Sequence, residues 1–321
     1  MSEPPSAPTR ALVTGAGGYI GHKLVTALAR TGRLEALVAA DVRAPASPVA
    51  GVVHARVDVR DAAGLTQLMK EHGIEVVVHL AAVVSPKGGA RAKEEYEIDV
   101  DGTRNVLDAC LSTGARKLVH ASSGAAYGYH ADNPSLLRED DRLRGNDEFP
   151  YARHKRLVEE LLADHRVAHP ELQQLVFRPG TVLGAGVRNQ ITAIFEGPAV
   201  LGLSDAASPF TLVWDEDVVA CLSRGALGEE VGIFNLAGDG VMTLREIAAR
   251  LRKPFVGVPS HAMELALRAA KALGVAPWGP EQVRFLKYRP VLDNQRLKTV
   301  FGYTPRLSTR EVFELYCASA G

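Results

Sequence analysis

Short apolar runs alternate with longer amphipathic segments through the first half of the chain. The apolar runs, several of them rich in β-branched residues, occupy 11–13, 37–41, 52–58, 75–81, 117–122 and 175–177. The segments between them have helical periodicity, most clearly at 19–30, 62–72 and 94–112. Runs that are apolar throughout fit strands covered on both faces. The alternation therefore predicts an α/β fold with a doubly wound parallel sheet.

The pattern becomes less regular from about residue 184, where prolines interrupt it repeatedly. We expect a first domain over 10–183 and a smaller, mainly substrate-binding lobe over 184–321. Some segments, at about 211–237, are expected to return to the first domain. Residues 1–9 hold three prolines and no apolar run, which predicts a flexible tail.

Composition and charge argue against several classes of partner. Lys plus Arg and Asp plus Glu both number 37, so no net charge attracts nucleic acid or an anionic membrane. No apolar run is long enough to span a membrane, and charges interrupt 262–276, which predicts an amphipathic surface helix. Residues 1–10 have neither an apolar stretch nor a basic flank, so we expect that they are not a secretory signal, and the three distant cysteines indicate a cytoplasmic setting. His165 and His169 lack a third ligand nearby, so we expect no metal site.

A glycine-rich turn joins the first apolar run to the first helical segment. Gly15 permits a tight turn, Gly18 allows a pyrophosphate to approach the backbone, and Gly21 lets the helix pack on the strand. Tyr19 and Ile20 open the helix, whose first N–H groups and partial positive charge attract phosphate. This spacing between a strand and a helix predicts a dinucleotide-binding site.

An acidic residue, Asp41, closes the second apolar run, 20 positions after Gly21. A carboxylate there accepts hydrogen bonds from ribose hydroxyls and repels a 2′-phosphate, which favours NAD over NADP, although Arg43 partly opposes this preference. Asp58 and Val59 follow the third run, where they either face the adenine or begin the next helix as its cap. The first domain is therefore expected to be an NAD-binding domain of the Rossmann type.

Tyr151 and Lys155 are spaced to share one face of a helix. A phenol with a pKa of about 10 is a poor base at neutral pH, but an ammonium and a cationic nicotinamide both lower that pKa. The resulting phenolate can take a proton from a secondary alcohol while hydride leaves the same carbon. Ser122 and Ser123 end the fifth run, at the edge where open sheets bind ligands, and a hydroxyl there can hold the substrate oxygen.

With these motifs in this order, the chain resembles the extended short-chain dehydrogenase/reductase family, in its NAD-dependent epimerase/dehydratase group. The resemblance runs from about residue 10 to about residue 313. It implies that Tyr151 is the catalytic acid/base, that Lys155 binds the nicotinamide ribose and lowers the pKa of Tyr151, and that Ser123 orients the substrate.

The resemblance also implies further cofactor contacts and an oligomeric state. Two segments would line the cofactor, one formed by Leu80, Ala81 and Ala82 and the other by Pro179, Gly180 and Thr181. Members often dimerise through helices that correspond to 94–112 and 151–165, so a homodimer is expected.

The sequence departs from the family pattern at one residue and in two short segments. Asp99 stands where the family usually has Asn, and a carboxylate lacks the donors of the amide. Residues 124–126 replace the Asp-Glu pair of the dehydratases, which argues against dehydration. The segment 178–184 lacks the Asn with which nucleotide-sugar enzymes help to hold the diphosphate, which weakens a nucleotide-sugar substrate.

These observations predict reversible hydride transfer between NAD and a secondary alcohol or ketone carbon of a small molecule, as in an epimerase of a sugar or nucleotide sugar. A dehydrogenase or reductase of a small hydroxy or keto metabolite shares this half-reaction and stays open. A non-catalytic nucleotide-binding protein is a remote third alternative. Tyr129 and His130 either contact the substrate or belong to a polar loop.

Overall fold

The computed structural model describes residues 8–84, 89–185, 187, 190–275 and 279–320. Most of the predicted tail, residues 1–7, lies outside this part of the chain. The chain divides into two compact units, each assembled from separate stretches. Among the described residues, the sheet unit comprises those within 8–123, 154–178 and 215–234, and the second unit comprises those within 124–153, 179–214 and 235–320.

A seven-stranded sheet forms the centre of the sheet unit, with the strand order β11-β6-β5-β4-β1-β2-β3. The registers of β1 through β6 are all parallel, which confirms the predicted doubly wound fold. Strand order reverses between β1 and β4, and ligands of such sheets bind beyond the carboxyl ends of the strands at that point. The strands are β1 (Arg10–Thr14), β2 (Ala36–Asp41), β3 (Val53–Arg56), β4 (Val76–His79), β5 (Lys117–Ala121), β6 (Gln173–Pro179) and β11 (Gly232–Leu236).

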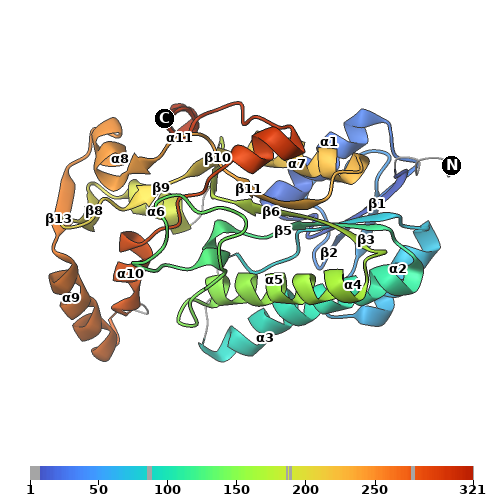
Figure 1. Cartoon of the computed structure of the whole chain (residues 1–321), viewed down its shortest axis with the longest axis horizontal. Helices are drawn as coiled ribbons and strands as arrows, with labels where there is room; N and C mark the ends of the chain where they lie inside the picture. Colours follow the sequence, from blue (N-terminus) through green and yellow to red (C-terminus); the bar gives the residue numbers. More distant parts are fainter. Residues whose placement is uncertain (1–7, 85–88, 186, 188–189, 276–278, 321) are drawn as a thin grey trace. The chain divides into compact units, whose positions relative to one another are not determined.

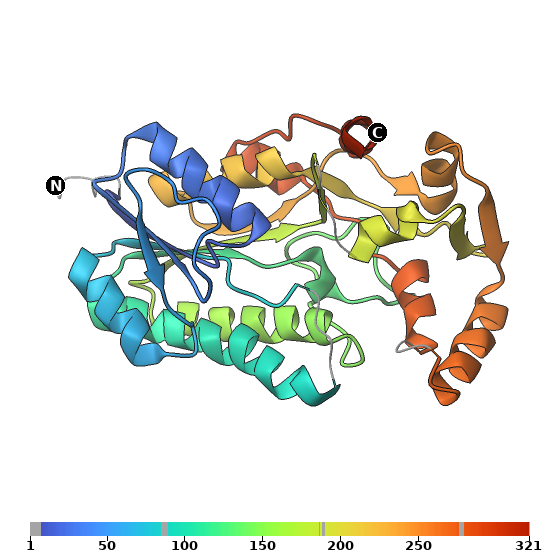
Figure 2. The same ribbon diagram turned by 180° about the vertical axis from the view of Figure 1, so that it is seen from behind.

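Helices cover both faces of this sheet. Figures 1 and 2 show α1 (Tyr19–Thr31) and α7 (Asp215–Leu227) on one face, with α2 (Ala62–His72), α4 (Gly102–Thr113) and α5 (Pro150–Ala168) on the other. The predicted helix at 94–112 is not continuous. The 3-10 turn η1 (Gly89–Arg91) leads into α3 (Ala92–Tyr96), and a π-helical turn, η2 (Glu97–Asp101), separates α3 from α4.

The core of the sheet unit explains the apolar runs, with one exception. Leu12, Val38, Val77 and Leu118 lie in the same buried cluster between the sheet and its helices. The prediction of burial on both faces is wrong for β3, where Val53 is 42% exposed. The reason is that β3 is an edge strand.

The second unit is built from short elements around its own apolar core. Three two-stranded sheets pair β10 with β7, β12 with β9, and β13 with β8. Phe195, Phe210 and Phe313 lie in its largest described cluster. Its strands are β7 (Thr181–Leu183), β8 (Val200–Leu203), β9 (Pro209–Phe210), β10 (Leu212–Trp214), β12 (Met242–Thr243) and β13 (Phe255–Val258). Its helices are η3 (Gly124–Tyr127), α6 (Gln190–Glu196), α8 (Leu244–Arg250), α9 (Ser260–Ala272), α10 (Glu281–Lys287), η4 (Leu297–Phe301) and α11 (Thr309–Ala320).

The helix predicted at 262–276 corresponds to α9, and residue 276 lies outside the described residues. Within the part of the chain that the structure describes, none of the helices combines the length and the apolar character that crossing a bilayer requires.

Candidate active site

The glycine turn after β1 has the geometry that its sequence predicts. Gly15 has a φ of +70°, and a Cβ atom there would lie 2.6 Å from the backbone nitrogen of Ala81. A Cβ atom on Gly21 would collide with the carbonyl oxygen of Gly15. Gly15 is therefore required by both backbone conformation and space, and Gly21 by the close packing of α1 on the turn.

The N-terminus of α1 has the features of an anion site. Its N-cap, Gly18, makes no side-chain cap hydrogen bond, and its first turn contains no acidic residue. The first-turn N–H groups, including those of Tyr19 and Ile20, are thus not capped by a side chain of the N-cap residue. This arrangement fits the pyrophosphate of a dinucleotide.

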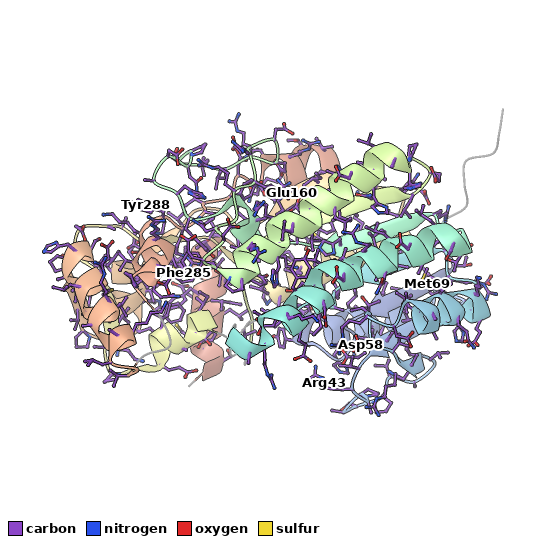
Figure 3. The ribbon with its side chains drawn as sticks, turned by 90° about the horizontal axis from the view of Figure 1, so that it is seen from below. Arg43, Asp58, Met69, Glu160, Phe285 and Tyr288 are labelled. Carbon is purple, nitrogen blue, oxygen red and sulfur yellow. The ribbon has the colours of Figure 1, made fainter. Side chains whose placement is uncertain are left out.

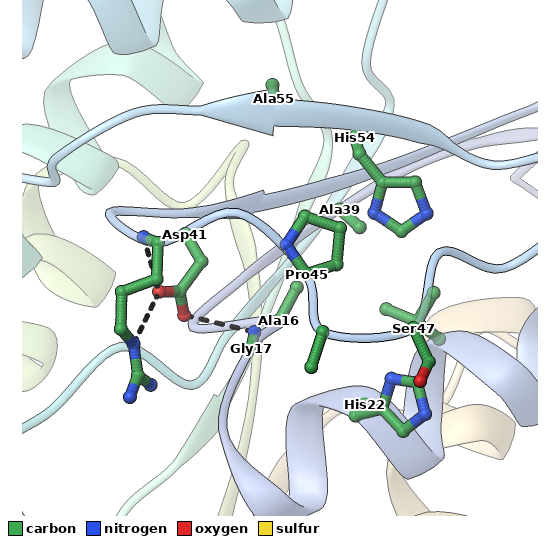
Figure 4. A pocket seen from close by; sticks show the side chains of 12 residues that line it. Ala16, Gly17, His22, Ala39, Asp41, Pro45, Ser47, His54 and Ala55 are labelled. Atoms are coloured by element: carbon green, nitrogen blue, oxygen red, sulfur yellow. Dashed lines mark hydrogen bonds and ion pairs between the residues drawn. The ribbon is translucent and has the colours of Figure 1, made fainter.

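Asp41 closes β2 beside the glycine turn. Its Oδ2 accepts a hydrogen bond of 3.0 Å from the backbone N–H of Gly17, and its Oδ1 accepts one of 3.0 Å from the N–H of Arg43. Asp41, Gly17 and Arg43 all line a cavity of about 190 Å³ (Figure 4). The other lining residues are Ala16, His22, Val25, Ala39, Pro45, Ala46, Ser47, His54 and Ala55. A carboxylate that lines a small, partly apolar cavity next to the glycine turn fits the adenosine end of NAD.

Replacing Asp41 by Ala is expected to weaken NAD binding by about tenfold to a hundredfold, because charge-assisted hydrogen bonds to the ribose contribute about 1.5–3 kcal/mol. Discrimination against NADP should relax, since the repelling charge is gone while Arg43 stays 72% exposed. Calorimetric titration with both coenzymes measures this. The double variant Asp41→Ala/Arg43→Ala should bind NADP more weakly than Asp41→Ala does. An unchanged coenzyme preference in Asp41→Ala would show that this carboxylate does not belong to the cofactor site.

Asp58 and Val59 lie in the loop after β3. The Arg60 guanidinium, 2.6 Å from the carboxylate, holds the pKa of Asp58 below its usual range. The alternative that Asp58 caps the next helix is wrong, because Asp61 caps α2 by accepting the N–H of Gly64 at 2.9 Å. A contact of Asp58 or Val59 with adenine stays a prediction.

The predicted segment Leu80–Ala82 follows β4 directly. The N–H of Leu80 donates to the carbonyl oxygen of Thr14 at 3.1 Å, and Gly15 abuts the backbone of Leu80 and Ala81. The structure therefore brings this segment against the glycine turn, at the switch point of the sheet.

Helix α5 carries Tyr151 in its first turn and Lys155 one turn later. Lys155 is buried, and its Nζ donates a hydrogen bond of 2.9 Å to the carbonyl oxygen of Ala121, the last residue of β5. Ser123 follows two residues later and is half-buried. Its neighbour Ser122 is buried and donates to Glu159 at 2.5 Å, so Ser122 has a structural partner.

Two opposing effects act on the ammonium of Lys155. Burial is the larger effect and lowers the pKa of Lys155, while the carboxylates of Asp99 and Glu159 oppose that shift. Glu159 is itself held by Arg178, whose Nη2 lies 2.6 Å from Oε2. This buried pair joins α5 to β6 one turn after Lys155 and so fixes the position of the lysine.

Two buried histidines, His79 on β4 and His120 on β5, are expected to make the fold sensitive to acid. Burial, helped by the nearby Lys155 charge, lowers the pKa of His79 to about 3 and that of His120 well below its usual value. Both histidines bind a proton near pH 6.5 when the chain is unfolded, but not when it is folded. The contribution of the two neutral histidines to the free energy of unfolding is therefore fully present above about pH 6.5. It is lost as the pH is lowered towards 3, by about 1.4 kcal/mol per pH unit for each histidine.

Urea unfolding of His120→Leu and the parent protein between about pH 7 and pH 5 measures this effect. The slope of stability against pH should be smaller in the variant by the contribution of one histidine. Equal slopes would show that His120 is not kept neutral by the fold.

The predicted segment Pro179–Thr181 belongs to the second unit. The N–H of Gly180 donates to Leu236 at 2.9 Å, and the N–H of Thr181 donates to Thr211 at 2.9 Å. The hydroxyl of Thr181 accepts a hydrogen bond of 3.1 Å from Nη2 of Arg289. These contacts fix the backbone of the segment, and its contact with the nicotinamide stays a prediction.

Tyr129 is part of an aromatic cluster and not of a polar loop. It is buried, and its ring centroid lies 5.1 Å from those of Phe149 and Phe285. Phe285 comes from α10 (Figure 3). His130 bonds the carbonyl oxygen of Arg144 at 2.7 Å.

Sequence reasoning missed three residues at or near these sites. Asp215 accepts a hydrogen bond from the Tyr19 hydroxyl and pairs with Lys23. His154, directly before Lys155, pairs with Asp99 at 2.7 Å. Arg289 places a buried guanidinium in the second unit. Only the departure at Asp99 signalled any of these contacts in the sequence.

The profile of the NAD dependent epimerase/dehydratase family matches residues 11–222 of the chain. The chain is 24% identical over 326 residues to the uncharacterized protein Rv0501 of Mycobacterium tuberculosis, covering 100% of this chain and 86% of that protein.

Two solved structures resemble the fold over nearly the full length of the chain. MoeE5 in complex with UDP-glucuronic acid and NAD has a TM-score of 0.74 at 25% identity, covering 97% of this chain and 98% of MoeE5. The UDP-glucose 4-epimerase of Thermus thermophilus in complex with NAD has a TM-score of 0.72 at 25% identity, with coverage of 97% and 98%.

Proposed function

Because the chain belongs to the NAD-dependent epimerase/dehydratase family, we propose that it inverts a secondary alcohol carbon of a sugar or nucleotide sugar by reversible hydride transfer. This membership confirms the family that the sequence motifs predict. It also confirms the prediction of an NAD-dependent enzyme of the extended short-chain dehydrogenase/reductase type. The homodimer and the cytoplasmic location stay predictions.

The observation that carries the proposal is the position of the Lys155 ammonium. Its hydrogen bond of 2.9 Å to Ala121 holds it at the carboxyl end of β5, two residues before Ser123 and one helical turn after Tyr151. An ammonium at this place stabilises a phenolate on the preceding turn of α5. Burial from water strengthens this electrostatic effect.

This arrangement supports one role for each residue in the proposed reaction. The Ser123 hydroxyl orients the substrate oxygen, and the Oη of Tyr151 takes the alcohol proton as the carbon is oxidised. Bound NAD supplies the hydride acceptor, and later the hydride donor. The Oη of Tyr151 then returns the proton to the oxygen when the ketone is reduced from its other face.

Arg289 supports a substrate that carries negative charge. Its guanidinium carbon lies 4.0 Å from the ring centroid of Phe210 and 4.6 Å from that of Phe285. Within the described chain its Nε and Nη1 are buried without a hydrogen-bond partner, and burial lowers its pKa to about 10. A buried cation without an anionic partner is unfavourable, so a bound anion would stabilise it. The UDP-glucuronic acid bound by MoeE5 is such an anion.

A dehydrogenase of a small hydroxy or keto metabolite is the second candidate, favoured by Thr181 at the place where nucleotide-sugar enzymes have Asn. Incubation of the protein and NAD with UDP-sugars, and separately with hydroxy acids, distinguishes the two. Inverted stereochemistry without net NADH supports the epimerase. NADH in proportion to the substrate consumed would overturn the epimerase and support the dehydrogenase.

A further inference from the structure

A chain of buried polar groups links the end of β1 to α5. The Thr14 hydroxyl lies 2.7 Å from Nδ1 of His79, and Nε2 of His79 lies 3.0 Å from the Thr103 hydroxyl. That hydroxyl donates to the carbonyl oxygen of Asp99 at 2.6 Å, and the Asp99 carboxylate lies 2.7 Å from Nδ1 of His154. The chain thus begins one residue before the glycine turn and ends one residue before Lys155.

Asp99 joins three elements through its carboxylate. Its Oδ1 accepts a hydrogen bond of 2.7 Å from the N–H of Val83, in the segment after β4, and its Oδ2 faces Nδ1 of His154 on α5. An ionised carboxylate only accepts hydrogen bonds, so Nδ1 of His154 carries the proton. The ring of Tyr96 packs edge-on against His154, with centroids 5.7 Å apart, and the side chains of His154 and Asp99 are 4% and 6% exposed.

The charge on Asp99 matters because it acts on the buried ammonium of Lys155, the residue directly after the histidine that Asp99 contacts. The groups that act on this ammonium come from four elements: Asp99 from η2, Glu159 from α5, His79 from β4 and His120 from β5. Both histidines are neutral at pH 7, because their pKa values are lowered by burial. The two carboxylates therefore stabilise the charged form of Lys155, and Arg178 already neutralises Glu159 at 2.6 Å.

Resting on the function proposed above, we propose that Asp99 and His154 are positioning residues for Lys155. His154 holds the Asp99 carboxylate in place and fixes the start of α5 to the segment at Val83. Asp99 supplies negative charge that favours the ammonium form of the buried lysine and opposes the effect of burial. Lys155 in turn holds Tyr151 ready as a base.

Asp99→Asn tests the charge, because the substitution is isosteric. The titration of the Lys155 ammonium, followed by NMR of labelled lysine and assigned with Lys155→Met, should move to lower pH. A less charged Lys155 stabilises the phenolate less, so the pH at which kcat reaches half its maximum should rise by about one unit, which lowers kcat by up to about tenfold at a pH below both midpoints. KM should change little, because Asp99 is expected to act through Lys155 and not on the substrate.

Asp101→Asn is the matched control, since Asp101 belongs to the same π-helical turn and is partly exposed. His154→Asn keeps an N–H donor near the place of Nδ1 and should retain most of the activity, whereas His154→Leu should behave like Asp99→Asn. The double variant Asp99→Asn/His154→Leu should be little worse than either single variant, as for two residues that act as one unit.

The readouts separate this proposal from the function on which it rests. An unmoved Lys155 titration in Asp99→Asn, or equal loss in His154→Asn and His154→Leu, would overturn the positioning role. A shifted titration in a protein that turns over no alcohol substrate would support the pair and overturn the proposed function.

Discussion

Tyr151→Phe is expected to lower turnover about a thousandfold, the contribution typical of a positioned acid/base, while NAD affinity stays within about twofold. The reason is that the substitution removes only the phenolic oxygen, and Lys155 keeps its hydrogen bond to Ala121 at 2.9 Å. Steady-state kinetics on a substrate found among the UDP-sugars and hydroxy acids, together with calorimetric titration with NAD, measure both quantities.

Two further variants make this result specific. Tyr303→Phe removes a phenolic oxygen from the segment after η4 and should leave turnover unchanged. Lys155→Met should lower both turnover and NAD affinity, because the lysine is expected to bind the nicotinamide ribose as well as to tune the phenol. Turnover by Tyr151→Phe close to that of the parent protein would show that another group is the base.

The parallel sheet was predictable from sequence because local signals agree along it. Strands such as β4 are apolar on both faces, and helices such as α2 are amphipathic, so each segment indicates its own structure. The glycine turn was predictable for the same reason, since Gly15 and Gly21 meet steric demands within a few residues of one another. The edge strand β3 and the π-helical turn were not predictable, because they depend on the position in the sheet and on packing.

The polar partners of the candidate site were beyond sequence reasoning. Tyr151 and Lys155 are one turn apart on one helix, which sequence spacing reports directly. His154 and Asp99 are separated by 55 positions, and Tyr19 and Asp215 by 196, so no local pattern pairs them. The presence of Asp at position 99, where the family usually has Asn, indicated that the contacts of this side chain differ from those in the family. Only the fold shows that His154 is its partner.

Glu159→Gln is expected to reduce the free energy of unfolding by about 3–5 kcal/mol, the loss typical when one partner of a buried ion pair is neutralised. Arg178 contacts Glu159 through Nε at 2.8 Å and through Nη2 at 2.6 Å, and both side chains are buried. The amide removes the charge that Glu159 places against this guanidinium, and it supplies a donor where the carboxylate accepted hydrogen bonds from both Arg178 and Ser122.

The adjacent residue is a matched control, since Glu160 lies on the same helix (Figure 3) but is 51% exposed and pairs only with Arg156 one turn away among the contacts described. Glu160→Gln should change stability by no more than about 0.5 kcal/mol. Urea unfolding of both variants measures the contrast. A loss below about 1 kcal/mol in Glu159→Gln would mean that Arg178 is compensated in some other way. Because the pair lies one turn after Lys155, its loss should also weaken NAD binding, which ties the stability of α5 to the position of the catalytic lysine.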